Sequence, residues 1–301
     1  MKISNRRRGV LDYLRKKIAR RYLRKISREH VNSYDQLVLF SFDFISQSIF
    51  IDGRFENNAL SLIEKLFKDK MDEKLTLDIG ANIGNHTLAL SKFSKMVYSF
   101  EPNPTVFDVL KLNTRNIENV KIFNFGASDQ DQSITAKVPK LNCGAGSVYF
   151  EKKSKKTNQF YEYSFVLKQL DQLDTLSNKM IGLIKIDVEG HELQAFKGMR
   201  QLLEKNKPVI LFEQNRGISH GSSSEVEFLK SIGYSYLYEL RKVDDWLVPN
   251  WMPKGIVSFF RLLEVLMLGE PSSELELNLI NTLENNKVYD MLVFSFDEIK
   301  T

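Results

Sequence analysis

A short apolar stretch that runs into a glycine-bearing turn limits the folds open to this chain more than any other segment. Leu75–Ile79 has the length and composition of a buried β-strand, Gly80 and Gly84 follow it, and a helical pattern continues to about Phe93. Glycines at such a turn allow a tight bend and let a ligand approach without meeting a Cβ atom. The segment predicts a strand–turn–helix unit with a ligand site at the carboxyl end of the strand.

The same alternation of strand and helix continues to about residue 240. Further strands are expected at Met96–Phe100, Val120–Phe125, Leu183–Ile186, Val209–Phe212 and Tyr234–Leu240, with helices at Thr105–Arg115, Glu192–Glu204 and Ser224–Ser231. Strands that alternate with helices of this length indicate right-handed βαβ units. We therefore predict an α/β fold with an open, mostly parallel twisted sheet and helices on both of its faces.

Two parts of the chain depart from this rhythm. Segment 130–168 is interpreted as an insertion beside the sheet, with short strands at Ser133–Val138, Ser147–Phe150 and Ser164–Leu167. Met291–Phe294 is expected as an antiparallel edge strand, which mixed sheets commonly carry. We divide the chain into residues 1–33, a lead-in at 34–73, a core at 74–240 and an extension at 241–301 that completes the sheet.

Positive charge is concentrated before the core. Residues 1–30 contain twelve Lys or Arg against two acidic residues, a net charge of +10, so the remaining 271 residues carry −5. Val10 to Arg28 is predicted as an amphipathic helix, and most of its basic residues, except Arg15, lie outside an apolar stripe. The stripe consists of Leu11, Leu14, Ile18, Tyr22 and Ile26. Tyr34–Ile51 is expected to form one or two short strands, and Glu56–Lys68 a helix.

The cysteine content and hydropathy point to an intracellular protein. Cys143 is the single cysteine, so no intrachain disulfide can form, and no stretch of about 18 uninterrupted apolar residues exists. The basic first residues do not lead into the apolar run of a secretory signal. We expect a cytoplasmic location.

The acidic residue before the glycine turn bears on which ligand binds there. A dinucleotide-binding turn has the pattern G-x-G-x-x-G, and its second glycine admits the pyrophosphate. Here that position is Asn82, and Asp78 would repel an anion. S-adenosylmethionine carries a sulfonium and an ammonium group and no phosphate. The turn therefore favours S-adenosylmethionine over a dinucleotide.

Two further acids are placed to hold a nucleoside. Glu101 ends the next strand, 21 residues after Gly80, where a carboxylate can accept hydrogen bonds from both ribose hydroxyls. Asp129 follows the third strand, where it can meet an adenine amino group or satisfy its own turn. A nucleoside is indicated, although these acids alone do not choose between cofactors.

Ionisable residues also gather at the tip of a later strand. Asp187 and Glu189 follow Ile184–Ile186, and His191 and Glu192 open the next helix. Asp187 is interpreted as functional, whereas Glu192 fits a charge at a helix N-terminus. Glu213 ends the neighbouring strand and either orients an acceptor or caps the strand.

These segments, in their order, resemble the FkbM family of methyltransferases. The matching pieces are Leu77–Gly84, Phe100–Pro104, Gly126–Asp129, Ile184–Gly190 and Pro208–Glu213. The resemblance implies a Rossmann-like class I methyltransferase fold and S-adenosylmethionine-dependent O-methylation, often of sugar hydroxyls in glycans or of natural products. It implies that Asp78, Gly80, Gly84, Glu101 and Asp129 hold the cofactor and that Asp187 and Glu189 lie near the transfer site. We expect the adjacent residues Asn82, Asn85, Pro102, Asn103 and Ser128 to belong to the same cofactor site.

The residues expected to carry the chemistry are Asp187, Glu189, His191 and Glu213. An alcohol attacks the sulfonium methyl more readily when a base takes its proton, and Asp187 or His191 is the expected base. Asp187, Glu189 and Glu213 could also offer oxygen ligands to Mg²⁺, but spacing alone assigns no metal site.

Two other functions compete with this interpretation. The basic segment before the core could bind nucleic acid, although the rest of the chain is acidic and contains no Pro-Pro pair of the kind found in base-amino methylases. It could instead act as a membrane-surface module, or hold the enzyme peripherally at the inner face of the membrane. A helix that merely packs its stripe on the body is equally compatible with the pattern.

Overall fold

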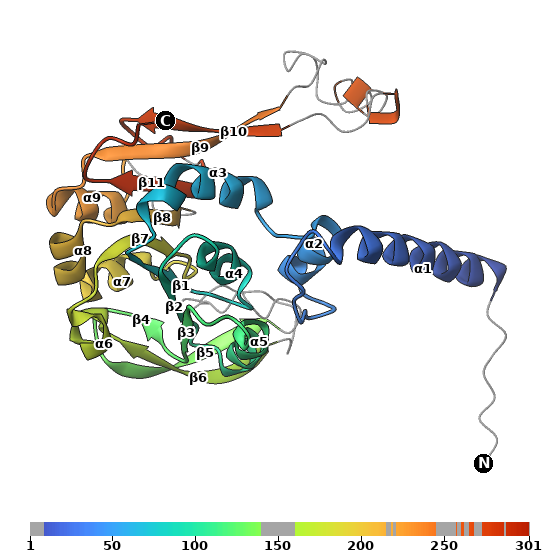
Figure 1. Cartoon of the computed structure of the whole chain (residues 1–301), viewed down its shortest axis with the longest axis horizontal. Helices are drawn as coiled ribbons and strands as arrows, with labels where there is room; N and C mark the ends of the chain where they lie inside the picture. Colours follow the sequence, from blue (N-terminus) through green and yellow to red (C-terminus); the bar gives the residue numbers. More distant parts are fainter. Residues whose placement is uncertain are drawn as a thin grey trace.

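A computed structural model describes residues 9–139, 160–214, 221–244, 273–285 and 287–300, together with residues 218, 257, 260–261 and 265–267. Its main feature is an eight-stranded sheet with the order β10-β9-β11-β8-β7-β1-β2-β3 (Figure 1). The strands of this sheet are β1 (Leu75–Ile79), β2 (Met96–Phe100), β3 (Val120–Phe123), β7 (Ile181–Ile186), β8 (Val209–Gln214), β9 (Tyr236–Asp244), β10 (Ser273–Ile280) and β11 (Tyr289–Ser295).

Five neighbouring strands, from β8 to β3 in that order, are all parallel. The strand predictions in this part are confirmed, and β1 and β2 have the predicted bounds. The helices between them are α4 (Asn85–Ser91), α5 (Pro104–Thr114), α6 (Asp174–Ser177), α7 (Glu192–Gly198), α8 (Arg200–Asn206) and α9 (Ser224–Ser231), with short 3-10 helices at Lys68–Lys70 and Leu170–Gln172. The predicted open, mostly parallel α/β sheet is therefore confirmed.

The antiparallel part of the sheet differs from the prediction in one respect. β11 is antiparallel as expected for Met291–Phe294, but it lies between β8 and β9 and not at the edge. The antiparallel edge strand is β10, which pairs with β9 over eight residues and was not predicted. β11 has a neighbouring strand on each side, and all of its residues except Asp290 are buried.

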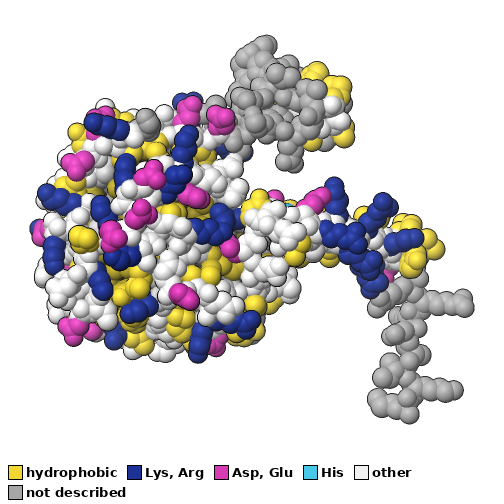
Figure 2. Space-filling model, viewed as in Figure 1, with side chains coloured by type: hydrophobic (Ala, Val, Ile, Leu, Met, Phe, Trp, Pro, Cys, Tyr) yellow, Lys and Arg dark blue, Asp and Glu magenta, His cyan; other side chains and the backbone are white. Residues whose placement is uncertain are grey.

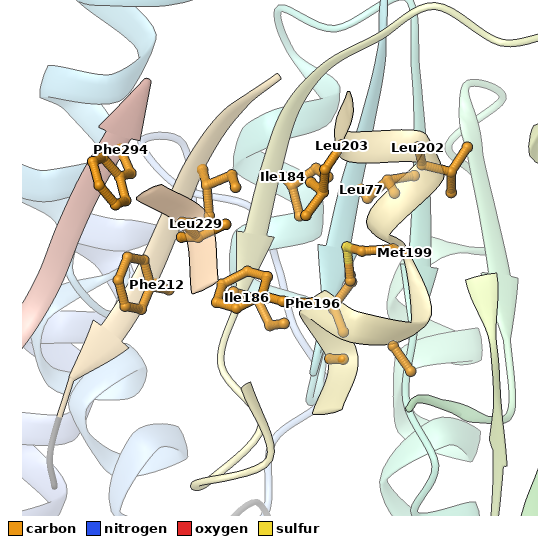
Figure 3. Close-up of a cluster of buried hydrophobic side chains, with 14 of the residues drawn as sticks. Leu77, Ile184, Ile186, Phe196, Met199, Leu202, Leu203, Phe212, Leu229 and Phe294 are labelled. Carbon is orange, nitrogen blue, oxygen red and sulfur yellow. The ribbon is translucent and has the colours of Figure 1, made fainter. Parts of the chain in front are cut away.

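Helices cover the sheet on both faces. One core cluster joins α7, α8 and α9 to the strands through residues such as Phe196, Leu203 and Leu229 (Figure 3). A second joins α4 and a preceding helix, α3 (Asn57–Phe67), to Leu183 and Val97 on the opposite face. Successive side chains of a strand point to opposite faces of the sheet. Because helices cover both faces, most residues of these strands are apolar.

The predicted helix Glu192–Glu204 is two helices. Met199, with φ −124° and ψ 20°, separates α7 from α8, and the preceding Gly198 lies so close to the chain that an added Cβ atom would stand 1.7 Å from the Ser128 carbonyl oxygen. The chain changes direction where Gly198 packs against Ser128. This contact is not visible in the pattern of apolar residues, so the break between the two helices was not predicted.

A second, three-stranded sheet contains the described parts of the inserted segment, residues 132–139 and 160–168. It has the order β4-β6-β5, with β4 (Gly126–Ala127), β5 (Gln132–Pro139) and β6 (Phe160–Lys168). The strands expected at Ser133–Val138 and Ser164–Leu167 are confirmed within β5 and β6. The strand expected at Ser147–Phe150 lies outside the described residues.

The segments before the core contain three α-helices in the described residues, and a short 3-10 helix. α1 (Val10–His30) confirms the predicted amphipathic helix, and α3 confirms the helix expected near Glu56–Lys68. The strands expected within Tyr34–Ile51 are wrong, since α2 covers Phe44–Asp52. Asp43 caps it by accepting a hydrogen bond from the Ser46 amide at 3.0 Å, and Ile45 and Ile49, one turn apart, pack beside Ile83 and Val106. Burial of this pair outweighs the strand propensity of the aromatic residues nearby.

We expect α3 to be part of the cooperative core. Ile63 is 1% exposed and packs in the cluster that contains Leu183 and Val97, so Ile63→Ala should lower the free energy of unfolding by about 2–5 kcal/mol. Lys65→Ala, on the exposed side of the same helix, is the matched control. Urea unfolding followed by circular dichroism measures both. Equal stability of the two variants would show that α3 is not packed as described.

Candidate functional site

The strand register brings the ends of four strands to one edge. Ile79 of β1 pairs with Phe100 of β2 and with Ile186 of β7, and Ile186 pairs with Phe212 of β8. The residues that follow these positions are Gly80, Glu101, Asp187 and Glu213. Four of the predicted site residues, from segments up to 133 positions apart in the chain, therefore share the carboxyl edge of the sheet.

The turn after β1 is built on glycine. Gly80 has φ +78°, and a Cβ atom there would lie 1.8 Å from the carbonyl oxygen of Asp187. Gly84, with φ +97°, precedes α4, where a Cβ atom would lie 2.9 Å from Leu110. Asn82 also has a left-handed backbone, with φ 51°, and its side-chain oxygen accepts a hydrogen bond from the Ile83 amide. The turn is thus held tightly against the end of β7.

Glu101 is fixed by the backbone. Its two carboxylate oxygens accept hydrogen bonds from the amides of Asn82, at 3.0 Å, and Asn103, at 2.8 Å. Asn103 caps α5 by accepting from the Thr105 amide, and Pro102 lies between the two. Burial raises the pKa of Glu101 to about 7, although both backbone hydrogen bonds lower it. The carboxyl group therefore titrates near neutral pH.

A buried lysine, Lys185, joins the acids at the ends of β1 and β7. Its ammonium nitrogen lies 3.7 Å from Asp78 Oδ1 and 3.6 Å from Asp187 Oδ2, and it donates to the Gly80 carbonyl at 3.2 Å. Asp78 is fully buried and accepts from the Thr87 hydroxyl at 2.6 Å through its other oxygen. Asp187 is 40% exposed, so its carboxylate is open to solvent on one side.

The charges around Lys185 decide its state. Burial lowers the pKa of Lys185, but the negative charges of Asp187, Asp78 and Glu56 together outweigh this effect and raise it above its usual value. The lysine is therefore cationic at neutral pH. Two carboxylates, Asp78 and Asp187, thus lie beside one ammonium group, and the charge of Glu56 also acts on it.

The lead-in contributes one wall of the site. The Glu56 carboxylate lies 2.9 Å from His86 Nε2, and Asn85 exchanges two hydrogen bonds with the backbone of Phe55. Burial raises the pKa of Glu56, but the hydrogen bond and charge of His86, with the charge of Lys185, lower it overall. Glu56 itself has a left-handed backbone, with φ 54°. Such strain persists only where the surrounding structure enforces it.

His191 lies beside Ser128, in the segment that follows β3 and β4. Its Nε2 atom is 2.9 Å from the hydroxyl of Ser128, whose oxygen also lies 3.3 Å from Asp129. Burial lowers the pKa of His191, and the charge of Asp129 opposes that shift only in part. The structure thus groups His191 with Ser128 and Asp129.

The remaining acids have distinct positions. Glu192 accepts hydrogen bonds from the amides of Val188 and Gly190 and so closes the turn before α7, as expected of a charge at a helix N-terminus. Glu189 has a left-handed backbone in that turn, with φ 54°, and Glu213 is half-buried in β8. Within the described part of the chain, no group of three His, Cys, Asp or Glu residues is arranged to hold a metal ion.

Sequence reasoning missed Lys185, Glu56 and His86. Lys185 has a detectable signal, since a lysine inside the otherwise apolar run Ile181–Ile186 needs a buried counter-charge. Glu56 and His86 are thirty residues apart and carry no such signal, because their pairing depends on how α3 packs.

Comparison with known proteins settles the family. Residues 78–246, more than half of the chain, match the Methyltransferase FkbM domain. The chain belongs to this family. The predicted family, and with it the class of S-adenosylmethionine-dependent methyltransferases built on a class I fold, is confirmed.

Individual relatives are more distant. The hexuronic acid methyltransferase AglP of Haloferax volcanii is 27% identical over 158 residues, which span 50% of this chain and 60% of AglP. A probable ribosomal RNA small subunit methyltransferase A of Methanosphaera stadtmanae is 29% identical over 122 residues, or 40% of this chain and 41% of that protein. The crystal structure of an FkbM methyltransferase from Methylobacillus flagellatus aligns with 73% of this chain and 56% of its own, with 15% identity and a TM-score of 0.40.

The titration of Glu101 should appear in cofactor affinity. Its pKa of about 7 means that the carboxyl is largely protonated at about pH 6 and charged at about pH 8. A charged carboxylate is the stronger hydrogen-bond acceptor, so affinity for the demethylated cofactor, S-adenosylhomocysteine, should rise between these pH values. The nearby charge of Lys185 does not reverse this sign, because its pKa is raised above its usual value and it stays cationic over this range.

Calorimetry on Glu101→Gln provides the control. This variant should bind about tenfold or more weakly at the higher pH, since hydrogen bonds to charged groups contribute about 1.5–3 kcal/mol, and its affinity should change less with pH. Unchanged affinity in Glu101→Gln would exclude contact of this carboxylate with the cofactor.

Removing the ammonium of Lys185 should destabilise the fold. Lys185→Met leaves Asp78 buried without its counter-charge, and breaking a buried pair in this way costs about 3–5 kcal/mol. Lys95→Met, which removes an exposed partner of Glu73, should change stability by no more than about 1 kcal/mol. Urea unfolding compares them, and a Lys185→Met variant as stable as Lys95→Met would contradict the electrostatic role of Lys185.

Proposed function

We propose that this protein transfers a methyl group from S-adenosylmethionine to a sugar hydroxyl in a glycan or glycoconjugate. The observation that carries the cofactor part is the acidic cluster at the carboxyl edge, where Asp78 and Asp187 lie 3.7 Å and 3.6 Å from the buried Lys185 ammonium and the charge of Glu56 also acts on it. Such a cluster favours a sulfonium and an ammonium group over a pyrophosphate. The sugar acceptor is supported by the similarity to the hexuronic acid methyltransferase AglP.

The cofactor residues divide by the part of the ligand that they can meet. We assign the ribose hydroxyls to Glu101, whose two oxygens are oriented by backbone amides. We assign the adenine to Asp129 and Ser128, which lie beside His191. Gly80, Asn82, Gly84 and Asn85 form the turn over which the methionine part would lie, with Asp78 beneath it.

Asp187 is the proposed base. Bound S-adenosylmethionine supplies an electrophilic methyl group, which passes to the acceptor oxygen as the S–CH₃ bond breaks and its electron pair returns to sulfur. Asp187 takes the hydroxyl proton at a carboxylate oxygen, and its partial exposure lets an acceptor reach it. Lys185 holds this carboxylate from its buried side. His191 is the weaker alternative because it is buried and already bonded to Ser128.

Glu189 and Glu213 are proposed to orient the acceptor. Glu213 stands next to Asp187 in register on the neighbouring strand, and Glu189 lies two residues beyond Asp187 in the turn. Carboxylates beside a base are suited to accept hydrogen bonds from further sugar hydroxyls, which would align the reacting one.

A nucleic-acid acceptor is the second candidate. The similarity to a probable ribosomal RNA methyltransferase and the basic residues before the core favour it. Residues 31–301, which contain the proposed pocket, carry a net charge of −5 and would repel a phosphate backbone near the transfer site. We therefore favour a sugar acceptor, which lacks the repeated phosphate charges of RNA.

Incubation with methyl-labelled S-adenosylmethionine tests the acceptor class. We expect label in a hexuronic acid or another sugar acceptor, recovered as an O-methyl ether, and no label in ribosomal RNA. Label in RNA alone would overturn the proposed acceptor while leaving the methyltransferase activity intact.

Asp187→Asn should separate binding from transfer. The variant keeps the size of the side chain and loses the proton acceptor, so we expect nearly unchanged affinity for S-adenosylhomocysteine and a rate lower by about 10²–10⁴-fold. Glu225→Gln, on α9, is the matched control and should react normally. A fully active Asp187→Asn enzyme would remove Asp187 from the mechanism.

A further inference from the structure

α1 presents a stripe of apolar side chains that nothing in the described structure covers. Leu11, Leu14, Ile18 and Tyr22 are 73%, 44%, 68% and 53% exposed, and Ile26 is the single buried residue of the helix. The helix meets α2 near its carboxyl end and otherwise extends away from the body (Figure 1). Packing of the stripe on the body, one of the alternatives that the sequence allows, is therefore not what the structure has.

The stripe is regular enough to be a contact face. Spacings of three, four and four residues put Leu11, Leu14, Ile18 and Tyr22 on one side of the helix. Twenty-one residues at 1.5 Å each make this helix about 30 Å long. Exposed apolar side chains in such a row mark an interaction surface more often than isolated ones do.

The charge of α1 complements an anionic surface. Eight of its residues are Lys or Arg and two are acidic, and Figure 2 shows the basic side chains gathered on this helix, away from the mixed charges of the body. Lys16, Arg20 and Arg24 lie on the side opposite the stripe, while Arg15 and Arg21 lie at or beside it. Long basic side chains next to an apolar face can extend to the level of lipid headgroups.

We propose that α1 docks this protein on a membrane surface containing anionic lipid. The helix would lie in the interface, with its stripe among the acyl chains and its basic residues at the headgroups. No helix in the described part of the chain is long and apolar enough to cross a bilayer, so the contact would be peripheral. RNA would bind the same basic side chains but would leave the apolar stripe exposed to water.

Neighbouring residues extend this apolar surface. Val38, Phe42, Phe44 and Ile51, in and before α2, are between 43% and 66% exposed. Because α2 contacts α1, these side chains lie near the base of the proposed docking helix. The remainder of the chain is net acidic and would be repelled by an anionic leaflet, which favours docking through α1 and the apolar residues at its base.

Vesicle co-sedimentation of the full chain tests the proposal with two matched variants. Leu14→Ser combined with Ile18→Ser removes the stripe and keeps every charge, whereas Arg20→Gln combined with Arg24→Gln removes charge and keeps the stripe. The vesicles are phosphatidylcholine alone or phosphatidylcholine mixed with phosphatidylglycerol. Unchanged S-adenosylhomocysteine affinity in both variants confirms that their bodies remain folded.

We expect binding to the mixed vesicles, weakened by salt, and little binding to phosphatidylcholine alone. Each double variant should bind the mixed vesicles at least about tenfold more weakly. No affinity for anionic vesicles, or a serine variant that binds as well as the wild type, would overturn the proposal. The proposal would also be overturned if the wild type bound a labelled RNA tightly, the glutamine variant did not bind it and the serine variant bound it as the wild type does.

Discussion

The close packing of Gly80 against the carbonyl of Asp187 is the contact on which the rest of the site depends. A Cβ atom at residue 80 would lie 1.8 Å from that oxygen, so no other residue type could occupy the turn without moving β1 away from β7. Since the two strands are neighbours in register, their ends meet at this point. Asp78 and Lys185, which precede it on the two strands, and Asp187 consequently face one another.

Two buried acids at this edge of the sheet, Asp78 and Glu101, have different hydrogen-bond and charge partners. Asp78 has an ammonium group at 3.7 Å and a hydroxyl donor at 2.6 Å, whereas Glu101 is held by two backbone amides, and burial raises its pKa to about 7. Burial of charged groups has a desolvation cost that apolar side chains in the same place would not have. Such a cluster therefore contributes little to the stability of the fold. The cationic ligand proposed for this acidic cluster would offset part of that cost.

Local sequence determined most of the parallel core and little of what surrounds it. Apolar runs bounded by glycine or proline located β1 and β2 to the residue, and the register then placed Gly80, Glu101 and Asp187 at one edge. β10 was missed because its alternating Ser273–Ile280 segment is half charged and polar, and it becomes a strand through pairing with β9. α2 was read as strand because its stabilising contacts come from Ile83 and Val106, far along the chain.

Glu56 was not predicted from the sequence for the same reason, because its contacts depend on how distant segments pack. Glu56 lies outside the matched span of residues 78–246, yet it contacts His86 inside that span and acts on the charge of Lys185. Its left-handed backbone opens α3, whose other side packs on the sheet. Asn85 and Phe55 fasten the same junction. The matched span thus supplies the turn, Asp78 and Asp187, while the segment that follows α1 and α2 supplies Glu56, whose carboxylate lies 2.9 Å from His86 Nε2.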